Sequence, residues 1–173
     1  MAESFWEKVK TDSLRQGDVI SNCMVPEFAP DYGRNGKVHE VPVKEYDLII
    51  VSQSCDLENK KLDLVTLCPI YSIKNFEEHN PDFKKKRAWE RVRKGREEGL
   101  HLLSSYDEPD NNRKAMVVVY KAIYSLPFVY LERKVKKLGD RYRLKSPYLE
   151  HFSQSFARFF MRVGLPSQIP EYS

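Results

Sequence analysis

The sequence is poor in the residues that mark disulfide frameworks, metal sites and membrane spans. Its three cysteines are an odd number at wide spacings, which argues against a disulfide framework. None of its four histidines is spaced from a cysteine or another histidine as a zinc site requires. No stretch approaches the ~20 apolar residues of a membrane span, and the first residues do not read as a secretory signal. We therefore expect a soluble, cytoplasmic protein with no metal ion and no other cofactor.

The composition is that of a globular chain of ordinary size. It has 173 residues, of which 41% are hydrophobic and 31% are charged, and its mean hydropathy is -0.59. This length suits one domain with a sizeable core. We predict a single domain over residues 1–173.

Apolar runs predict a mainly β protein with helices, of the α+β class. Residues 48–51 (LIIV) are continuously apolar and mostly β-branched, which is typical of a strand covered on both faces. Residues 62–70 predict an antiparallel neighbour, and residues 115–120 (AMVVVY) predict another buried strand. Two further strands, 128–135 and 141–144, are expected to flank a turn.

The strongest helix signal lies near the end of the sequence, over residues 146–164. Ser146 can cap this helix, and Gly164 supplies its stop. Its polar stripe contains Arg158 and Arg162, a further candidate for contact with an anion or a partner. A short helix is also expected over residues 4–10, because Phe5 and Val9 lie four residues apart.

A strongly basic run lies in a second helical segment, which we predict over residues 75–99 as one helix inserted between strands. Residues 84–96 (KKKRAWERVRKGR) hold eight bases and one acid, whereas the rest of the chain carries a net charge of -3. The run favours nucleic-acid phosphates, with a base stacked on Trp89, although an acidic protein or a merely solvated helix face would also explain it. The candidate binding residues are Lys84, Lys85, Lys86, Arg87, Trp89, Arg91, Arg93, Lys94 and Arg96.

Polar residues cluster where the strand 48–51 ends. They are Ser52, Ser54, Cys55 and Asp56. A cysteine or serine beside an acid could form a nucleophilic site, but no histidine that could act as the base lies nearby in the sequence. We prefer a structural interpretation in which Asp56 caps a turn and Cys55 packs in the core.

The order of motifs resembles that of the MazF/PemK toxin family. The motifs are a Gly-Asp turn that opens a strand at 17–19, a loop at 26–36, LIIVSQ at 48–53, and VTLCPI at 65–70 followed by Tyr71-Ser72. The resemblance implies a small SH3-like β-barrel of MazF/PemK type, here with an inserted basic helix and a C-terminal helix. It also implies a homodimer, and active members of the family cleave single-stranded RNA with an arginine and a serine or threonine.

The residues at the matching positions favour binding over catalysis. Ser72 matches the hydroxyl residue, but Tyr46 and Asp47 stand where the family has its arginine, and an aspartate there repels a phosphate. We therefore expect a degenerate MazF-like module that binds a macromolecular partner in a bacterial defence or toxin–antitoxin system, in one version as an anti-sigma-like protein. The partner would be an antitoxin, a sigma factor, a protease or RNA. The alternative is a metal-independent endoribonuclease that uses Ser72 with Arg34, or His39 as a base.

Overall fold

The computed structural model describes residues 3–34 and 40–161. Its strands are β1 (Trp6–Val9), β2 (Val19–Pro26), β3 (Val43–Ile50), β4 (Leu64–Ser72), β5 (Leu100–Leu103), β6 (Met116–Val119), β7 (Tyr124–Pro127) and β8 (Arg141–Leu144). Its helices are α1 (Ser54–Glu58), α2 (Ile73–His79), α3 (Lys86–Arg93), α4 (Phe128–Leu138), α5 (Tyr148–Phe160) and the 3₁₀ helices η2 (Pro81–Lys84) and η3 (Asn112–Lys114). This arrangement confirms the predicted α+β class. Within the described residues, every helix is too short or too polar to span a lipid bilayer.

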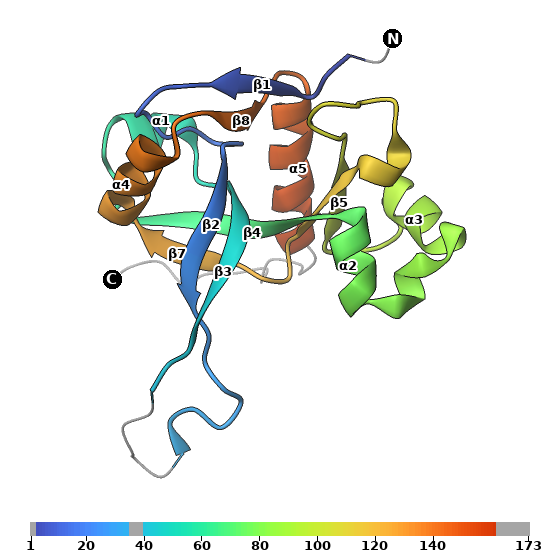
Figure 1. The fold of residues 1–173 in the computed structure, drawn as a ribbon, viewed down its shortest axis with the longest axis horizontal. Helices are drawn as coiled ribbons and strands as arrows, with labels where there is room; N and C mark the ends of the chain where they lie inside the picture. Colours follow the sequence, from blue (N-terminus) through green and yellow to red (C-terminus); the bar gives the residue numbers. More distant parts are fainter. Residues whose placement is uncertain (1–2, 35–39, 162–173) are drawn as a thin grey trace, which may run out of the picture.

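An antiparallel sheet forms the centre of the fold, in the order β2-β3-β4-β6-β5 (Figure 1). Leu67 of β4 lies opposite Ile50 of β3 on one edge and opposite Tyr124 of β7 on the other. Because β6 pairs with residues 70–72 of β4, β6 and β7 follow one another along the same edge. The strands β1 and β8 form a separate antiparallel pair.

Both faces of the sheet are buried, as the apolar run in β3 predicts. Successive side chains of a strand point to opposite faces. Ile49 therefore joins one hydrophobic cluster, with Phe152 of α5, whereas Leu48 and Ile50 join a second cluster with Leu131 of α4. All five side chains are 0% exposed. The prediction of a strand covered on both faces is thus confirmed.

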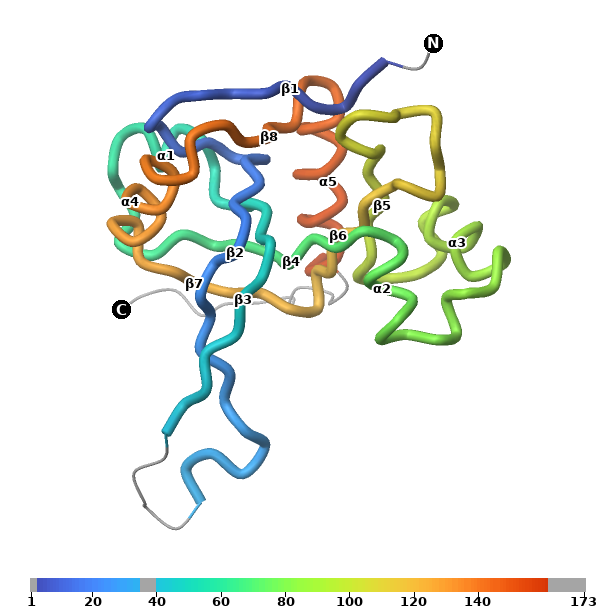
Figure 2. Tube along the Cα trace, viewed as in Figure 1, coloured from blue at the N-terminus to red at the C-terminus, as the bar shows by residue number. Residues whose placement is uncertain are grey.

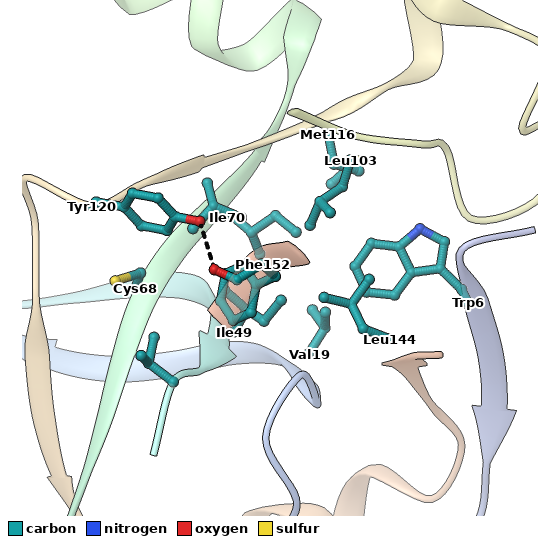
Figure 3. Packing of buried hydrophobic residues seen from close by; sticks show 12 residues of the cluster. Trp6, Val19, Ile49, Cys68, Ile70, Leu103, Met116, Tyr120, Leu144 and Phe152 are labelled. Carbon is teal, nitrogen blue, oxygen red and sulfur yellow. Dashed lines mark hydrogen bonds between the residues drawn. The ribbon is translucent and has the colours of Figure 1, made fainter. Parts of the chain in front are cut away.

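The cluster beneath α5 contains two large aromatic side chains whose polar atoms are hydrogen-bonded (Figure 3). The hydroxyl of Tyr120 donates to the carbonyl oxygen of Phe152 at 3.3 Å. The indole nitrogen of Trp6 donates to the carbonyl oxygen of Ser104 at 2.9 Å. A buried phenylalanine of this kind stabilises a fold by about 3–5 kcal/mol relative to alanine. Phe152 therefore anchors one face of α5 and leaves its opposite face for the surface.

A buried ion cluster joins the start of β2 to β8. Asp18 is fully buried, and its carboxylate accepts hydrogen bonds from Arg141 Nε and Arg143 Nη2, each at 3.0 Å. The two arginines are only 3% and 9% exposed. Both guanidinium groups also donate to the backbone carbonyl of Ser13. The predicted turn residue Asp18 is therefore the anionic centre of a hydrogen-bonded charge cluster.

The hairpin of β2 and β3 continues beyond the sheet as an arm, which Figure 2 shows extending away from the rest of the chain. The backbone N–H of Glu27 donates to Pro42 O at 2.9 Å, so the two sides of the arm remain paired past the strand ends. Phe28 and Tyr32 pack edge to face on the arm, with their ring centroids 4.5 Å apart. The predicted loop at 26–36 therefore has local structure in its described part.

The closed barrel that the family resemblance implies is not observed among the described residues. The strands β2 and β5 end the sheet on opposite sides and do not pair with each other. The reason is that β6 and β7 share one edge of β4, which leaves β5 beyond β6 rather than beside β2. The described sheet is open.

Two predicted helices differ from the structure in their bounds. The inserted segment 75–99 is not one helix but α2, η2 and α3, because Pro81 follows α2 and has no N–H with which to continue it. The C-terminal helix, predicted over 146–164, is confirmed as α5. Its N-cap is Pro147 rather than Ser146, and residues 162–164 lie outside the described residues.

Two local assignments were wrong. Residues 4–10 were expected to form a helix, but β1 pairs there with β8, from Trp6 opposite Leu144 to Val9 opposite Arg141. Residues 128–135 were expected to form a strand but belong to α4. The side chains of Leu131 and Val135, four residues apart, are buried on its inner face.

Candidate nucleic-acid interface

The helices α2, η2 and α3 form a helical lobe over residues 73–93, beside the sheet in Figure 1. Its small core is aromatic. The ring centroids of Phe76 and Phe83 lie 5.1 Å apart, and those of Phe83 and Trp89 lie 5.3 Å apart. Trp89 is half-buried, and its indole nitrogen donates to Glu77 Oε1 at 2.7 Å. Trp89 therefore holds the lobe together and does not present a free ring for base stacking.

The basic run 84–96 lies on the lobe and on the segment that leaves it. Two of its arginines form ion pairs, Arg91 with Glu97 and Arg93 with Glu90. The other six bases are exposed and form no ion pair with another described residue. They are Lys84, Lys85, Lys86, Arg87, Lys94 and Arg96. The lobe therefore carries positive charge that the described carboxylates do not neutralise.

A cleft of about 450 Å³ opens between α5 and the segment that leads from α3 into β5, and we call it the α5 cleft. Five of its lining residues come from α5, namely Phe159 and the polar residues His151, Gln154, Ser155 and Arg158. Gln154, Ser155 and Arg158 follow His151 by three, four and seven residues, and this spacing places the four polar side chains on one face of the helix. Phe152 is buried beneath α5, so the helix is held with these polar side chains toward the cleft.

Two aromatic residues of the sheet form the inner wall of the α5 cleft. His101 of β5 and Tyr120, directly after β6, both line the cleft, and their rings stack with centroids 5.9 Å apart. Burial, with a smaller contribution from nearby His151, lowers the pKa of His101 to about 4. At neutral pH the imidazole of His101 is therefore uncharged and has one donor nitrogen and one acceptor nitrogen.

A second cleft, of about 620 Å³, lies between β3 and α2, and we call it the β3 cleft. It is lined by Tyr46 and Asp47, the two residues that the resemblance would place at the position of the toxin family's arginine. Lys44, also in the wall, is held in an ion pair with Glu27. Burial raises the pKa of Tyr71 in the same wall to about 12. The described residues that line the β3 cleft thus include no arginine and no unpaired lysine for a phosphate.

The predicted catalytic residues Ser72, Arg34 and His39 are not brought together in the described part of the chain. The hydroxyl of Ser72 accepts the backbone N–H of Asn75 at 3.2 Å and so caps α2. Arg34 belongs to the arm, which extends away from α2 in Figure 2. His39 lies outside the described residues.

The strand-end cluster has structural roles at the start of α1. The hydroxyl of Ser52 accepts a backbone N–H of β4 at 2.8 Å, and that of Ser54 accepts one from Gln16 at 3.1 Å. Asp56 forms a long ion pair of 4.0 Å across the following turn. Cys55 is exposed, so its predicted packing in the core is wrong. These contacts account for both hydroxyls without a nucleophilic site.

Among the residues that line the α5 cleft, Arg158 was predicted from the sequence as a contact residue and the others were not. The spacing of His151, Gln154 and Ser155 with Arg158 was visible in the sequence. That one face of α5 would meet the segment before β5, however, depends on tertiary packing. In residues 3–34 and 40–161, no three histidine, cysteine or acidic side chains gather as a metal site would require.

Comparison with known proteins does not identify a family. No protein-family model matches the chain, and no curated protein matches its sequence significantly. The resemblance to the MazF/PemK family therefore depends on the motifs quoted above.

Proposed function

We propose that this protein is a binding module for single-stranded RNA and that the helical lobe is its main contact surface. The observation that carries the proposal is the set of six exposed cations in 84–96 that form no ion pair with another described residue. Such cations can replace the counterions along a phosphate chain. We prefer RNA to an acidic protein because the α5 cleft opens beside these cations and combines Arg158 with aromatic rings.

We further propose that the fold of this protein descends from the MazF/PemK scaffold and that the protein acts in a bacterial defence or toxin–antitoxin system. This descent is supported by the order of β2, the arm, β3, a β4 that contains Pro69 and Ile70, and a C-terminal helix. In the β3 cleft, Asp47 replaces the cation that would stabilise a cleaved phosphate. We infer that the scaffold keeps the capacity to bind and has lost its inherited chemistry.

The test compares two double variants that remove equal charge from different places. Lys85→Ala/Lys86→Ala removes two cations of the lobe, whereas Lys136→Ala/Lys137→Ala removes two exposed lysines at the end of α4. The readout is the fluorescence anisotropy of a short labelled single-stranded RNA. We expect the lobe variant to weaken binding about tenfold and the α4 variant to change it less than about twofold. Equal losses in both variants, or no binding by the wild type, would overturn the proposal.

A metal-independent endoribonuclease is the second candidate. The observation that favours it is that His101 lines the α5 cleft together with Arg158, since an imidazole can accept the proton of an attacking hydroxyl and an arginine can stabilise the phosphate. The same RNA is incubated with the protein and a chelator. The binding proposal predicts intact RNA. Cleavage lost in Arg34→Ala would support the predicted toxin site, and cleavage lost only in His101→Gln would support the α5 cleft.

A further inference from the structure

We propose that the α5 cleft holds one nucleotide of the bound RNA, with its phosphate against α5 and its base toward the segment that precedes β5. This inference rests on the proposed function, and it adds a subsite that selects the base. Nothing in the family resemblance places a site on these residues. The inference depends on the position of the cleft, its two chemically different walls and its volume.

The α5 cleft is continuous with the basic run. Gly95 lies in its wall, and the neighbouring Lys94 and Arg96 are both exposed. These two residues end the run that starts on the lobe at Lys84. A phosphate chain that follows the exposed cations is therefore led to the mouth of the cleft.

The α5 wall supplies the groups that suit a phosphate. Arg158 is exposed and forms no ion pair with another described residue, so its planar guanidinium can donate two parallel hydrogen bonds to phosphate oxygens. Gln154 lies one turn before it on the same face, and its amide group both donates and accepts. This wall thus combines a charged clamp with an adaptable polar group.

The rest of the cleft suits a base. The half-buried ring of Phe159, near the end of α5, and the neutral ring of His101 of β5 both line the cleft and can stack on a base. Glu97 and Glu98, in the segment that precedes β5, also line the cleft, and the carboxylate of Glu97 pairs with Arg91. Carboxylates repel a phosphate but accept N–H groups of a base, which fixes the orientation of the nucleotide.

The volume and the acceptors define the ligand. A cleft of about 450 Å³ falls within the range of small-molecule sites and is large enough for one nucleotide. A carboxylate acceptor favours bases with an exocyclic amino group over uracil. We therefore expect the site to prefer adenine, cytosine or guanine nucleotides to uridine nucleotides.

The direct test observes the two histidines of the cleft by NMR. Each common ribonucleoside 5′-monophosphate is titrated into the full chain while the ring C–H signals of His101 and His151 are followed. We expect at least one amino-bearing nucleotide to shift both signals saturably, with uridine monophosphate weaker. Arg158→Ala should weaken this binding about tenfold, whereas Arg133→Ala, an exposed arginine of α4, should leave it unchanged.

The outcomes separate this inference from the function on which it rests. If no nucleotide shifts either histidine, or if Arg158→Ala binds as well as the wild type, the subsite does not exist. If, in that case, RNA still binds and Lys85→Ala/Lys86→Ala still weakens its binding, the proposed function stands without the subsite. If the RNA itself does not bind, the function fails first. A shift caused equally by inorganic phosphate would show anion binding without base selection and would also overturn the inference.

Discussion

Replacing Asp18 by asparagine tests the buried ion cluster that joins β2 to β8. In the wild type one carboxylate serves two guanidinium groups, those of Arg141 and Arg143, which are 3% and 9% exposed. It also accepts the backbone N–H of Arg15 at 3.0 Å. The substitution keeps the size of the side chain but removes its charge, so two buried cations lose their counter-ion.

The expected loss of stability is large compared with the stability of a domain. Removing one member of a buried ion pair typically costs about 3–5 kcal/mol, because the remaining charge stays buried and uncompensated. An asparagine still offers one accepting oxygen, so we expect about 3 kcal/mol for Asp18→Asn and about 5 kcal/mol for Asp18→Ala. Folded domains are stable by only about 5–15 kcal/mol. The alanine variant should therefore be close to unfolded at room temperature.

Urea denaturation followed by tryptophan fluorescence measures this loss, with midpoints compared at equal slope. Asp56→Asn is the matched control, since its ion pair is long and partly exposed, and we expect a change below about 0.5 kcal/mol. A loss below about 1 kcal/mol for Asp18→Asn would refute the reasoning, because surface ion pairs already account for that much.

Three further predictions concern single residues. Cys55 should react with a thiol reagent in the native protein, whereas Cys23 and Cys68, buried and with their pKa raised to about 12 by burial, should react only after unfolding. Labelling of all three at one rate, seen by mass spectrometry, would contradict this. NMR titration should find the pKa of His101 near 4 rather than at the ordinary 6.5. Because the unfolded chain binds this proton more tightly than the folded chain, protonation of His101 should lower the free energy of unfolding by up to about 3 kcal/mol as the pH falls from 6.5 to 4. A measured pKa above 6 would contradict burial of its ring. Gly17→Ala should lower the melting temperature by about 4 °C or more, because φ of residue 17 is +82° and an added Cβ would lie 2.9 Å from the side chain of Leu149. An unchanged melting temperature would contradict this.

The elements that could be predicted from the sequence are those whose buried positions show within the element's own residues. The run at 48–51 is apolar at every position, and that pattern needs cover on both faces wherever the strand lies. The segment that became α4 fits two patterns at once, because it opens with a continuous apolar run at 128–131 that suits a strand, while its apolar residues also recur four apart at Leu131 and Val135. Its packing on the second face of the sheet decided in favour of the helix. The partner of β1 lies at the other end of the chain, so no local window could have shown that pairing.

The candidate site was only partly predictable for the same reason. The basic run is local and was found, but the ion pairs of Arg91 and Arg93 and the packing of Trp89 depend on the fold of the lobe. The α5 cleft unites α5 with β5 and the segment directly before β5, and α5 is distant in the sequence from both. A helical wheel of α5 would have shown that its polar residues share one face of the helix, but it would not have shown which segment of the chain packs opposite that face.

The most direct measurement of the central claim is the salt dependence of RNA affinity. If all six exposed cations of the basic run contact phosphates, the logarithm of the association constant for a short single strand should fall with the logarithm of salt at a slope of about −4. In Lys85→Ala/Lys86→Ala the slope should become about −3, because two contacts are lost. A slope near zero in the wild type, or the same slope in both proteins, would contradict binding of RNA by the helical lobe.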